Sequence, residues 1–272
     1  MSPPARAKSS LWKVVLLALI AAAVLIGWIV PAATYRQAAF LWLSNMALLL
    51  LFSVVSGYVI TGFLRGALID SRNKISLSRF QMLLWTILIL SGFLTAVLIN
   101  VRRGQSEPLS IALNPTLWEL LGISTASLVG SPLIKNNKKS EPTNMGAAVR
   151  TKSLLSRQGA SPSGVEAEGQ IVVNNDTKDA SFTDMFKGEE VGNAAFLDLG
   201  KVQMFYFTLI TWFVYATALG QMFERSTQPG APKIAGFPDL DTGMVALLGI
   251  SHAAYLANKA VPHTPQQTNS PP

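Results

Sequence analysis

The second half of the chain repeats an order of residues found in its first half, at an offset of 122 positions, the difference between 81 and 203. Five pairs match without a gap: Gln81 with Gln203, Met82 with Met204, Thr86 with Thr208, Thr95 with Thr217 and Ala96 with Ala218. After small insertions, Leu120 to Ala126 corresponds to Leu247 to Ala253. Such self-similarity predicts two related folding units, each of which needs the other to bury its apolar face.

Apolar residues are grouped into runs long enough to cross a bilayer. Half of the residues are hydrophobic and 14% are charged, whereas about 25% are charged in an ordinary soluble domain. Leu11 to Val30 is interrupted only by Lys13, and Phe40 to Phe63 contains no charged residue. Because roughly 20 apolar residues span the hydrocarbon, we predict a polytopic membrane protein. The first run has a signal-peptide alternative, but its length favours an uncleaved anchor.

We therefore expect an all-α membrane protein with six transmembrane helices. The last four form two parallel tandem repeats, each an interfacial helix and two spans, and an even number of crossings gives both repeats the same direction. The polar composition between the repeats favours a disordered cytoplasmic linker, which contains one apolar island, Gly169 to Val173. The predicted divisions are an N-terminal two-helix membrane segment at 1–63, repeat 1 at 64–135, the linker at 136–181, repeat 2 at 182–260 and a disordered tail at 261–272.

The net charge of +7 is distributed in a way that suits a membrane protein better than a nucleic-acid-binding protein. Most basic residues lie in alternate segments between the apolar runs, as the positive-inside rule predicts. This pattern places both termini and the linker in the cytoplasm and favours the inner membrane of a bacterial cell. The chain has no cysteine, so a disulfide and a thiolate metal site are excluded.

Small residues four positions apart follow one helical stripe in each repeat. Such stripes let helix backbones approach closely in lipid. The two stripes are Gly122, Ala126 and Gly130 in the first repeat and Gly249, Ala253 and Ala257 in the second. We expect helix packing at these positions, either between the two repeats or between copies of the chain. Ser53, Gly57 and Thr61 have the same spacing but no counterpart.

Polar residues within the spans have two interpretations. They can line a polar pathway for a solute, or they can hydrogen-bond one helix to another. The candidates are Gln81, Thr86, Gln203, Thr208 and His252.

Basic residues stand at matched points of the two interfacial segments: Arg65, Arg79, Lys187 and Lys201. The first expectation is contact with anionic lipid headgroups, at about 1 kcal/mol per cation. A phosphate-bearing ligand is the alternative.

The sequence offers no equipment for catalysis that we can identify. Ser251 and His252 are adjacent, so on one helix they point about 100° apart and cannot form a dyad. An HExxH pattern, a Walker loop and paired intramembrane aspartates are all missing from the sequence. We predict no catalytic residue, metal or cofactor.

The sequence thus predicts a non-enzymatic integral membrane protein that acts as an oligomeric scaffold or channel-like module. The expected partners are membrane lipids and a second copy or another membrane protein, without nucleic acid. A transporter of a small solute or ion is the first alternative. A membrane tether that recruits a cytoplasmic partner through the linker is the second.

Overall fold

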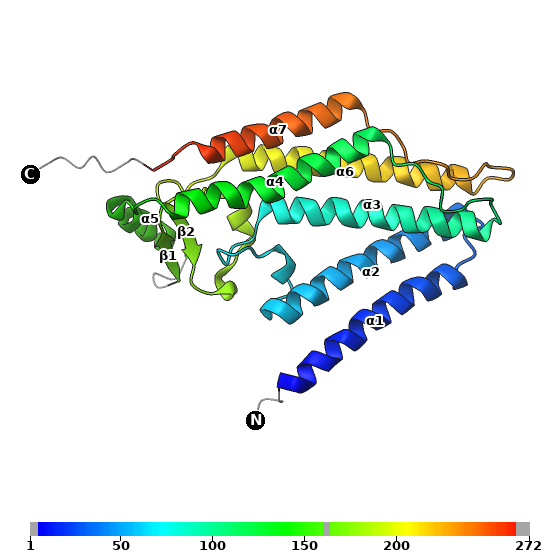
Figure 1. Cartoon of the computed structure of the whole chain (residues 1–272), viewed down its shortest axis with the longest axis horizontal. Coiled ribbons are helices and arrows are strands. Elements are labelled where there is room, and N and C mark those ends of the chain that lie inside the picture. Colours follow the sequence, from blue (N-terminus) through cyan, green and yellow to red (C-terminus); the bar gives the residue numbers. More distant parts are fainter. Residues whose placement is uncertain (1–4, 160–163, 265–272) are drawn as a thin grey trace, which may run out of the picture. The chain divides into compact units, whose positions relative to one another are not determined.

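The computed structural model describes residues 5–159 and 164–264, which are largely helical (Figure 1). The α-helices are α1 (Ala5–Ile29), α2 (Tyr35–Thr61), α3 (Leu77–Arg102), α4 (Pro115–Lys139), α5 (Met145–Arg157), α6 (Leu199–Ser226) and α7 (Thr242–Ala260). Between α5 and α6 lie the strands β1 (Val165–Glu168) and β2 (Ile171–Asn174) and the 3-10 helices η2 (Thr177–Asp179) and η3 (Phe182–Phe186). A further 3-10 helix, η1 (Gly66–Leu68), precedes α3.

Four helices in the described part of the chain are long and apolar enough to cross a bilayer: α2, α3, α4 and α6. This indicates a membrane protein. For α1 and α7 a crossing stays a prediction, and so does the total of six spans.

The ends of α2 show how local sequence fixes a helix. Thr34 accepts a hydrogen bond from the backbone N–H of Gln37, and the Gln37 side chain accepts one from the backbone of Thr34, which is a capping box. Gly62 ends the helix in the left-handed conformation at φ 80°. The small-residue stripe of α2 has a local role, since a Cβ built on Gly57 would lie 2.3 Å from the backbone nitrogen of Ala67.

The chain divides into two compact units that share α3, α4 and α6. The first, here called the apolar unit, consists of residues 5–67 together with Leu83–Glu119 and Ile210–Thr242. The second, called the polar unit, consists of the described residues of Leu68–Met82, Leu120–Leu209 and 243–264.

Within the apolar unit, α3 and α6 run parallel. The Trp212 indole donates to the carbonyl of Leu84 at 3.1 Å, and the rings of Trp85 and Tyr215 lie 6.3 Å apart. Polar side chains of α2 are satisfied by α3: Trp42 donates to Ser91 at 3.2 Å. The amide of Asn45 likewise donates to Thr95, at 3.0 Å. These bonds fix which faces of the helices meet.

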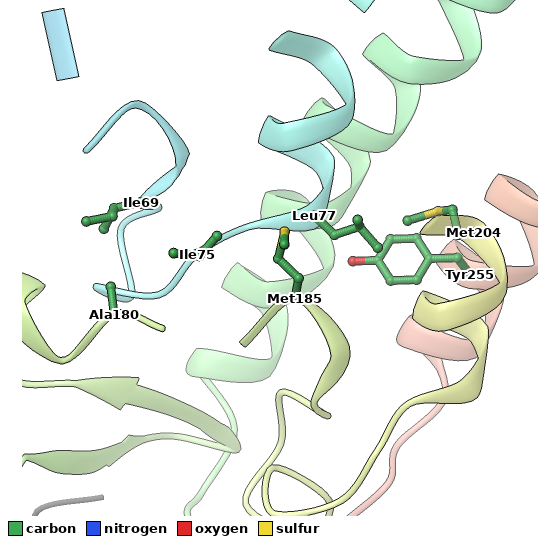
Figure 2. Packing of buried hydrophobic residues seen from close by; sticks show 7 residues of the cluster. All are labelled: Ile69, Ile75, Leu77, Ala180, Met185, Met204 and Tyr255. Atoms are coloured by element: carbon green, nitrogen blue, oxygen red, sulfur yellow. The ribbon is translucent and has the colours of Figure 1, made fainter. Parts of the chain in front are cut away.

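The polar unit has an apolar core at the start of α3 and α6. Figure 2 shows its members Ile69, Ile75, Leu77, Ala180, Met185, Met204 and Tyr255. Ile75 and Leu77 come from the segment that enters α3, while Met204 lies on α6 and Tyr255 on α7. Chain segments far apart in sequence thus close one core.

The structure differs from the expectation of a disordered linker. Residues 136–181 hold the end of α4, α5 and an antiparallel hairpin in which Glu168 pairs with Ile171. All four residues of β2 are buried, so the apolar island is a core strand. A second apolar cluster joins this segment to the one after it through Leu155, Val172 and Val191. Composition alone missed this, because the apolar side chains are few but are buried together with residues beyond position 181.

Two helix starts keep the spacing of the sequence repeat. The start of α6 at Leu199 lies 122 positions after the start of α3 at Leu77. An isolated antiparallel bridge precedes each of these helices. Ile69 pairs with Ile75, two residues before α3, and Lys187 pairs with Leu197, two residues before α6. These features are compatible with tandem duplication, which stays a prediction. The predicted tail falls outside the described residues from position 265 onward.

Candidate functional site

The helices α4 and α7 pack in parallel within the polar unit. Ser127 and His252 share a hydrogen bond of 2.5 Å, and further along both helices Lys259 donates to Ser131 at 2.6 Å. Leu256 lies 3.5 Å from a Cβ built on Gly130. The seam is therefore lined by serines and the side chains that they bond, in addition to small residues.

The predicted small-residue stripes lie mostly outside this seam. Gly122, Ala126, Ala253 and Ala257 are exposed, and a Cβ built on Gly122 meets nothing within 4 Å. Gly130 and Gly249 are half-buried, and a Cβ on Gly249 would lie 3.5 Å from Ile123. Packing between the repeats thus uses only the partly buried ends of the stripes.

The five predicted pathway residues are not equivalent. The Gln81 amide is buried and donates to Thr208 Oγ1 at 2.6 Å. Its counterpart Gln203 is exposed, and Thr86 is half-buried. The buried His252 is bonded to Ser127. The structure therefore brings Gln81 and Thr208 together but leaves Gln203 apart from them.

The four predicted headgroup cations also differ. Arg79 is exposed and donates to the carbonyl of Ile69 at 2.7 Å. Arg65 is half-buried and stands 4.9 Å from the ring centroid of Phe63. Lys187 is half-buried and donates to Gln158 at 3.2 Å. Lys201 is 3% exposed, so it belongs to the interior.

Lys201 is part of a buried ion network centred on Glu189. Its ammonium lies 3.1 Å from the Glu189 carboxylate, and the Arg72 guanidinium lies 3.3 Å from the same carboxylate. Lys259 forms a third ion pair with Glu189. Burial alone would raise the pKa of Glu189, but the three cations outweigh it and hold that pKa well below its usual range.

A second carboxylate, Asp70, anchors the other side of the network. It accepts hydrogen bonds from Arg72 at 2.8 Å and from Lys135 at 2.9 Å. Burial acts to raise the pKa of Asp70, yet the charges of Arg72 and Lys135 lower it well below its ordinary value. The pKa of Arg72 is raised, because Glu189 and Asp70 overcome the effect of burial. The two carboxylates and the Arg72 guanidinium are therefore held ionised.

A third buried carboxylate, Glu190, pairs with Lys138 at the C-terminal end of α7. Lys138 donates to Glu190 Oε1 at 2.5 Å and to the carbonyls of Lys259 and Val261 at 2.5 and 2.8 Å. Glu190 also accepts the backbone N–H of His263 at 2.8 Å. The carbonyls left open at a helix C-terminus thus receive a buried cation. The ion network as named below consists of Asp70, Arg72, Lys135, Lys138, Glu189, Glu190, Lys201 and Lys259.

Positive charge exceeds negative charge in this interior. Among the described residues of the polar unit, the buried basic side chains are Arg72, Lys74, Lys135, Lys138, Lys201 and Lys259, against the three carboxylates of Asp70, Glu189 and Glu190. A cavity of about 20 Å³ beside Lys135, Lys201 and Lys259 has room for about one water molecule. The network is tightly filled, which suits a structural role better than substrate binding.

Sequence reasoning assigned most of the network lysines to membrane topology and did not single out the carboxylates. The available signal was spacing: Lys135 and Lys138 lie three apart on α4, so they share a face, and Glu189 and Glu190 directly follow a matched Lys-Gly pair. That signal identifies a charged face but does not pair its members.

Comparison with known proteins gives no relative, since no family model, curated protein or solved structure matches the chain. Within residues 5–159 and 164–264, no group of three or more His, Asp or Glu side chains is placed to hold a metal ion.

Proposed function

We propose that the chain is a non-enzymatic integral membrane protein that acts as an oligomeric scaffold. Hydrogen bonds between helices and the ion network hold the polar unit in one defined shape. The exposed small-residue stripes offer a face for a second copy or another membrane helix. The expected setting is the inner membrane of a bacterial cell, with both termini and the basic segment between α4 and α6 in the cytoplasm.

The supporting observation is that polar side chains of the membrane helices bond to one another. The pairs Gln81 with Thr208 and Ser127 with His252 are buried and within hydrogen-bond distance. In lipid such pairs join helices, whereas a solute pathway requires polar groups that face water. This favours packing over transport.

Cysteine labelling tests the choice between scaffold and transporter. Because the chain has no cysteine, each introduced thiol reports alone. With a water-soluble reagent, Thr208→Cys should stay protected from both sides of the membrane, while the exposed Gln203→Cys serves as the reactive control. Rapid labelling of Thr208→Cys from both sides would support the transporter instead.

Assembly is tested by widening the exposed stripe. Ala253→Leu should lower the mass of the detergent-solubilised protein measured by light scattering, because a larger side chain keeps two helices apart. Ala254→Leu changes a neighbouring exposed alanine that lies about 100° away on the same helix. If the unaltered protein is a monomer, or if both variants behave alike, the scaffold proposal fails.

The tether alternative gains one supporting observation, since the segment after α4 is folded and so offers a shaped surface. A deletion of residues 141–176 is a poor test of this alternative, because it would also remove the buried Ile171 and Val172 from the core. Point substitutions of exposed residues such as Met145 and Val149 are the better test. Loss of a captured partner without loss of the fold would favour the tether.

A further inference from the structure

A second cavity, of about 210 Å³, lies in the polar unit away from the ion network. Its walls include Lys74, Asn174, Ser181, Thr183, Asp184 and Lys187. Figure 2 shows Ile75 and Ala180, the sequence neighbours of Lys74 and Ser181, in the apolar core of the polar unit. The volume far exceeds the roughly 10–15 Å³ that one water molecule needs, so the cavity has room for a small solute.

Lys74 is the unusual member of this wall. Its side chain is 6% exposed, yet its ammonium has no hydrogen bond or ion pair to any described residue. The buried lysines Lys135, Lys138, Lys201 and Lys259, in contrast, all contact a carboxylate. A buried ammonium without a partner is costly, and it is the kind of group that a ligand satisfies.

Two carboxylates, Asp179 and Asp184, share the cavity wall with Lys74, but neither forms an ion pair with its ammonium. Burial and the charge of Arg72 lower the pKa of Lys74 to about 8, and the charge of Asp184 only partly opposes this effect. The Asp184 carboxylate already accepts the backbone N–H groups of Ser181 at 2.8 Å and Ile75 at 3.4 Å. Lys74 therefore keeps its donors available on the cavity side.

The other wall residues define the charge of the ligand. Lys187 adds a second cation, while Asp179 and Asp184 add two carboxylates, so the lining as a whole carries little net charge. A polyphosphate would meet both carboxylates, whereas a single anionic group can pair with Lys74 and receive hydrogen bonds from the hydroxyls of Ser181 and Thr183.

We propose that this cavity binds a small solute through one carboxylate or phosphate group held by Lys74. This binding site is separate from the stripes and helix pairs on which the scaffold proposal depends, so either can fail alone. Because the lining has two carboxylates beside its two cations, it disfavours larger polyanions.

The test uses the full-length protein in detergent, with sodium acetate and sodium phosphate as probes and sodium chloride at equal ionic strength as control. An amine-reactive reagent modifies lysines, and mass spectrometry gives the rate at Lys74 and at the exposed Lys152, which lies outside this cavity. We expect acetate or phosphate to slow modification of Lys74 at least fivefold while Lys152 is unaffected. Protection by acetate alone assigns a carboxylate, and protection by phosphate alone assigns a phosphoryl group.

A Lys74→Met variant supplies the second readout. Since the substitution removes an unpaired buried charge, we expect it to fold and its midpoint of thermal unfolding to stay level or rise. The oxyanion that protects Lys74 should raise the midpoint of the unaltered protein and leave the variant unchanged. Equal protection by chloride, no protection by either oxyanion, or an equal rise in the variant would overturn the proposal.

Discussion

Replacing Glu189 by glutamine tests the energetic centre of the polar unit. Glutamine keeps the shape of the side chain but removes the charge that Arg72, Lys201 and Lys259 share. The Glu189 side chain is 10% exposed, so water can compensate only a small part of the loss. Breaking a buried ion pair from one side costs about 3–5 kcal/mol, because the partner charges remain buried.

A single introduced thiol can measure this loss in the intact protein. Val191 is fully buried in the polar unit, so Val191→Cys becomes reactive only when that unit opens. Because about 1.4 kcal/mol corresponds to a factor of ten, Glu189→Gln should accelerate labelling between about 100-fold and several thousand-fold.

The matched control is Glu168→Gln, which removes a carboxylate that is 51% exposed and pairs with Lys139. An exposed pair contributes about 0–1 kcal/mol, so labelling should accelerate by less than about fivefold. Equal effects of the two substitutions, or no effect of Glu189→Gln, would refute the conclusion that the network stabilises the polar unit.

Three further predictions concern glycine packing and pH. Gly57→Ala should lower the midpoint of thermal unfolding, because the added Cβ would lie 2.3 Å from a backbone atom. The overpacking cost is about 1–3 kcal/mol. In the control Gly220→Ala, the added Cβ meets its nearest atom at 3.8 Å and should have little effect. The pKa values of Asp70 and Glu189 are depressed in the folded state, so their stabilisation is complete above about pH 4.5 and is lost as the pH falls further. The thiol assay should record this loss as faster labelling of Val191→Cys relative to the exposed Gln203→Cys at the same pH, because the reactivity of every thiol falls with pH. The pKa of Lys74 falls from 10.5 to about 8 on folding, so the unfolded chain holds this proton longer. Between these pH values the stability of the unaltered protein should therefore rise by about 3 kcal/mol more than that of Lys74→Met.

The membrane helices could be predicted from sequence because length and apolar composition define them directly. Asn114-Pro115 predicts the helix start at Pro115, where α4 begins. The folded segment between α4 and α6 could not be predicted in the same way. Its strands have four residues each, and their side chains Val165 and Val172 are buried in one cluster with residues outside the hairpin, among them Val191 and Ala194, which the sequence does not place nearby.

The candidate site was harder to predict than the fold. Matched positions in a repeat predict matched environments, yet Gln81 is buried while Gln203 is exposed. Pairing of Asp70 with Lys135, or of Glu190 with Lys138, depends on tertiary contacts between residues separated by 65 and 52 positions. A charge count shows that such pairs are available, but only the folded chain selects the partners.

The ion network draws its members from both halves of the chain. Arg72 and Lys135 precede the hairpin, whereas Glu189, Lys201 and Lys259 follow it. Two identical copies of either half could not reproduce this arrangement, because the first half would lack Glu189 and the second would lack Arg72. If the gene arose from a symmetric ancestor, its halves have become complementary, and fusion into one polypeptide guarantees their one-to-one stoichiometry.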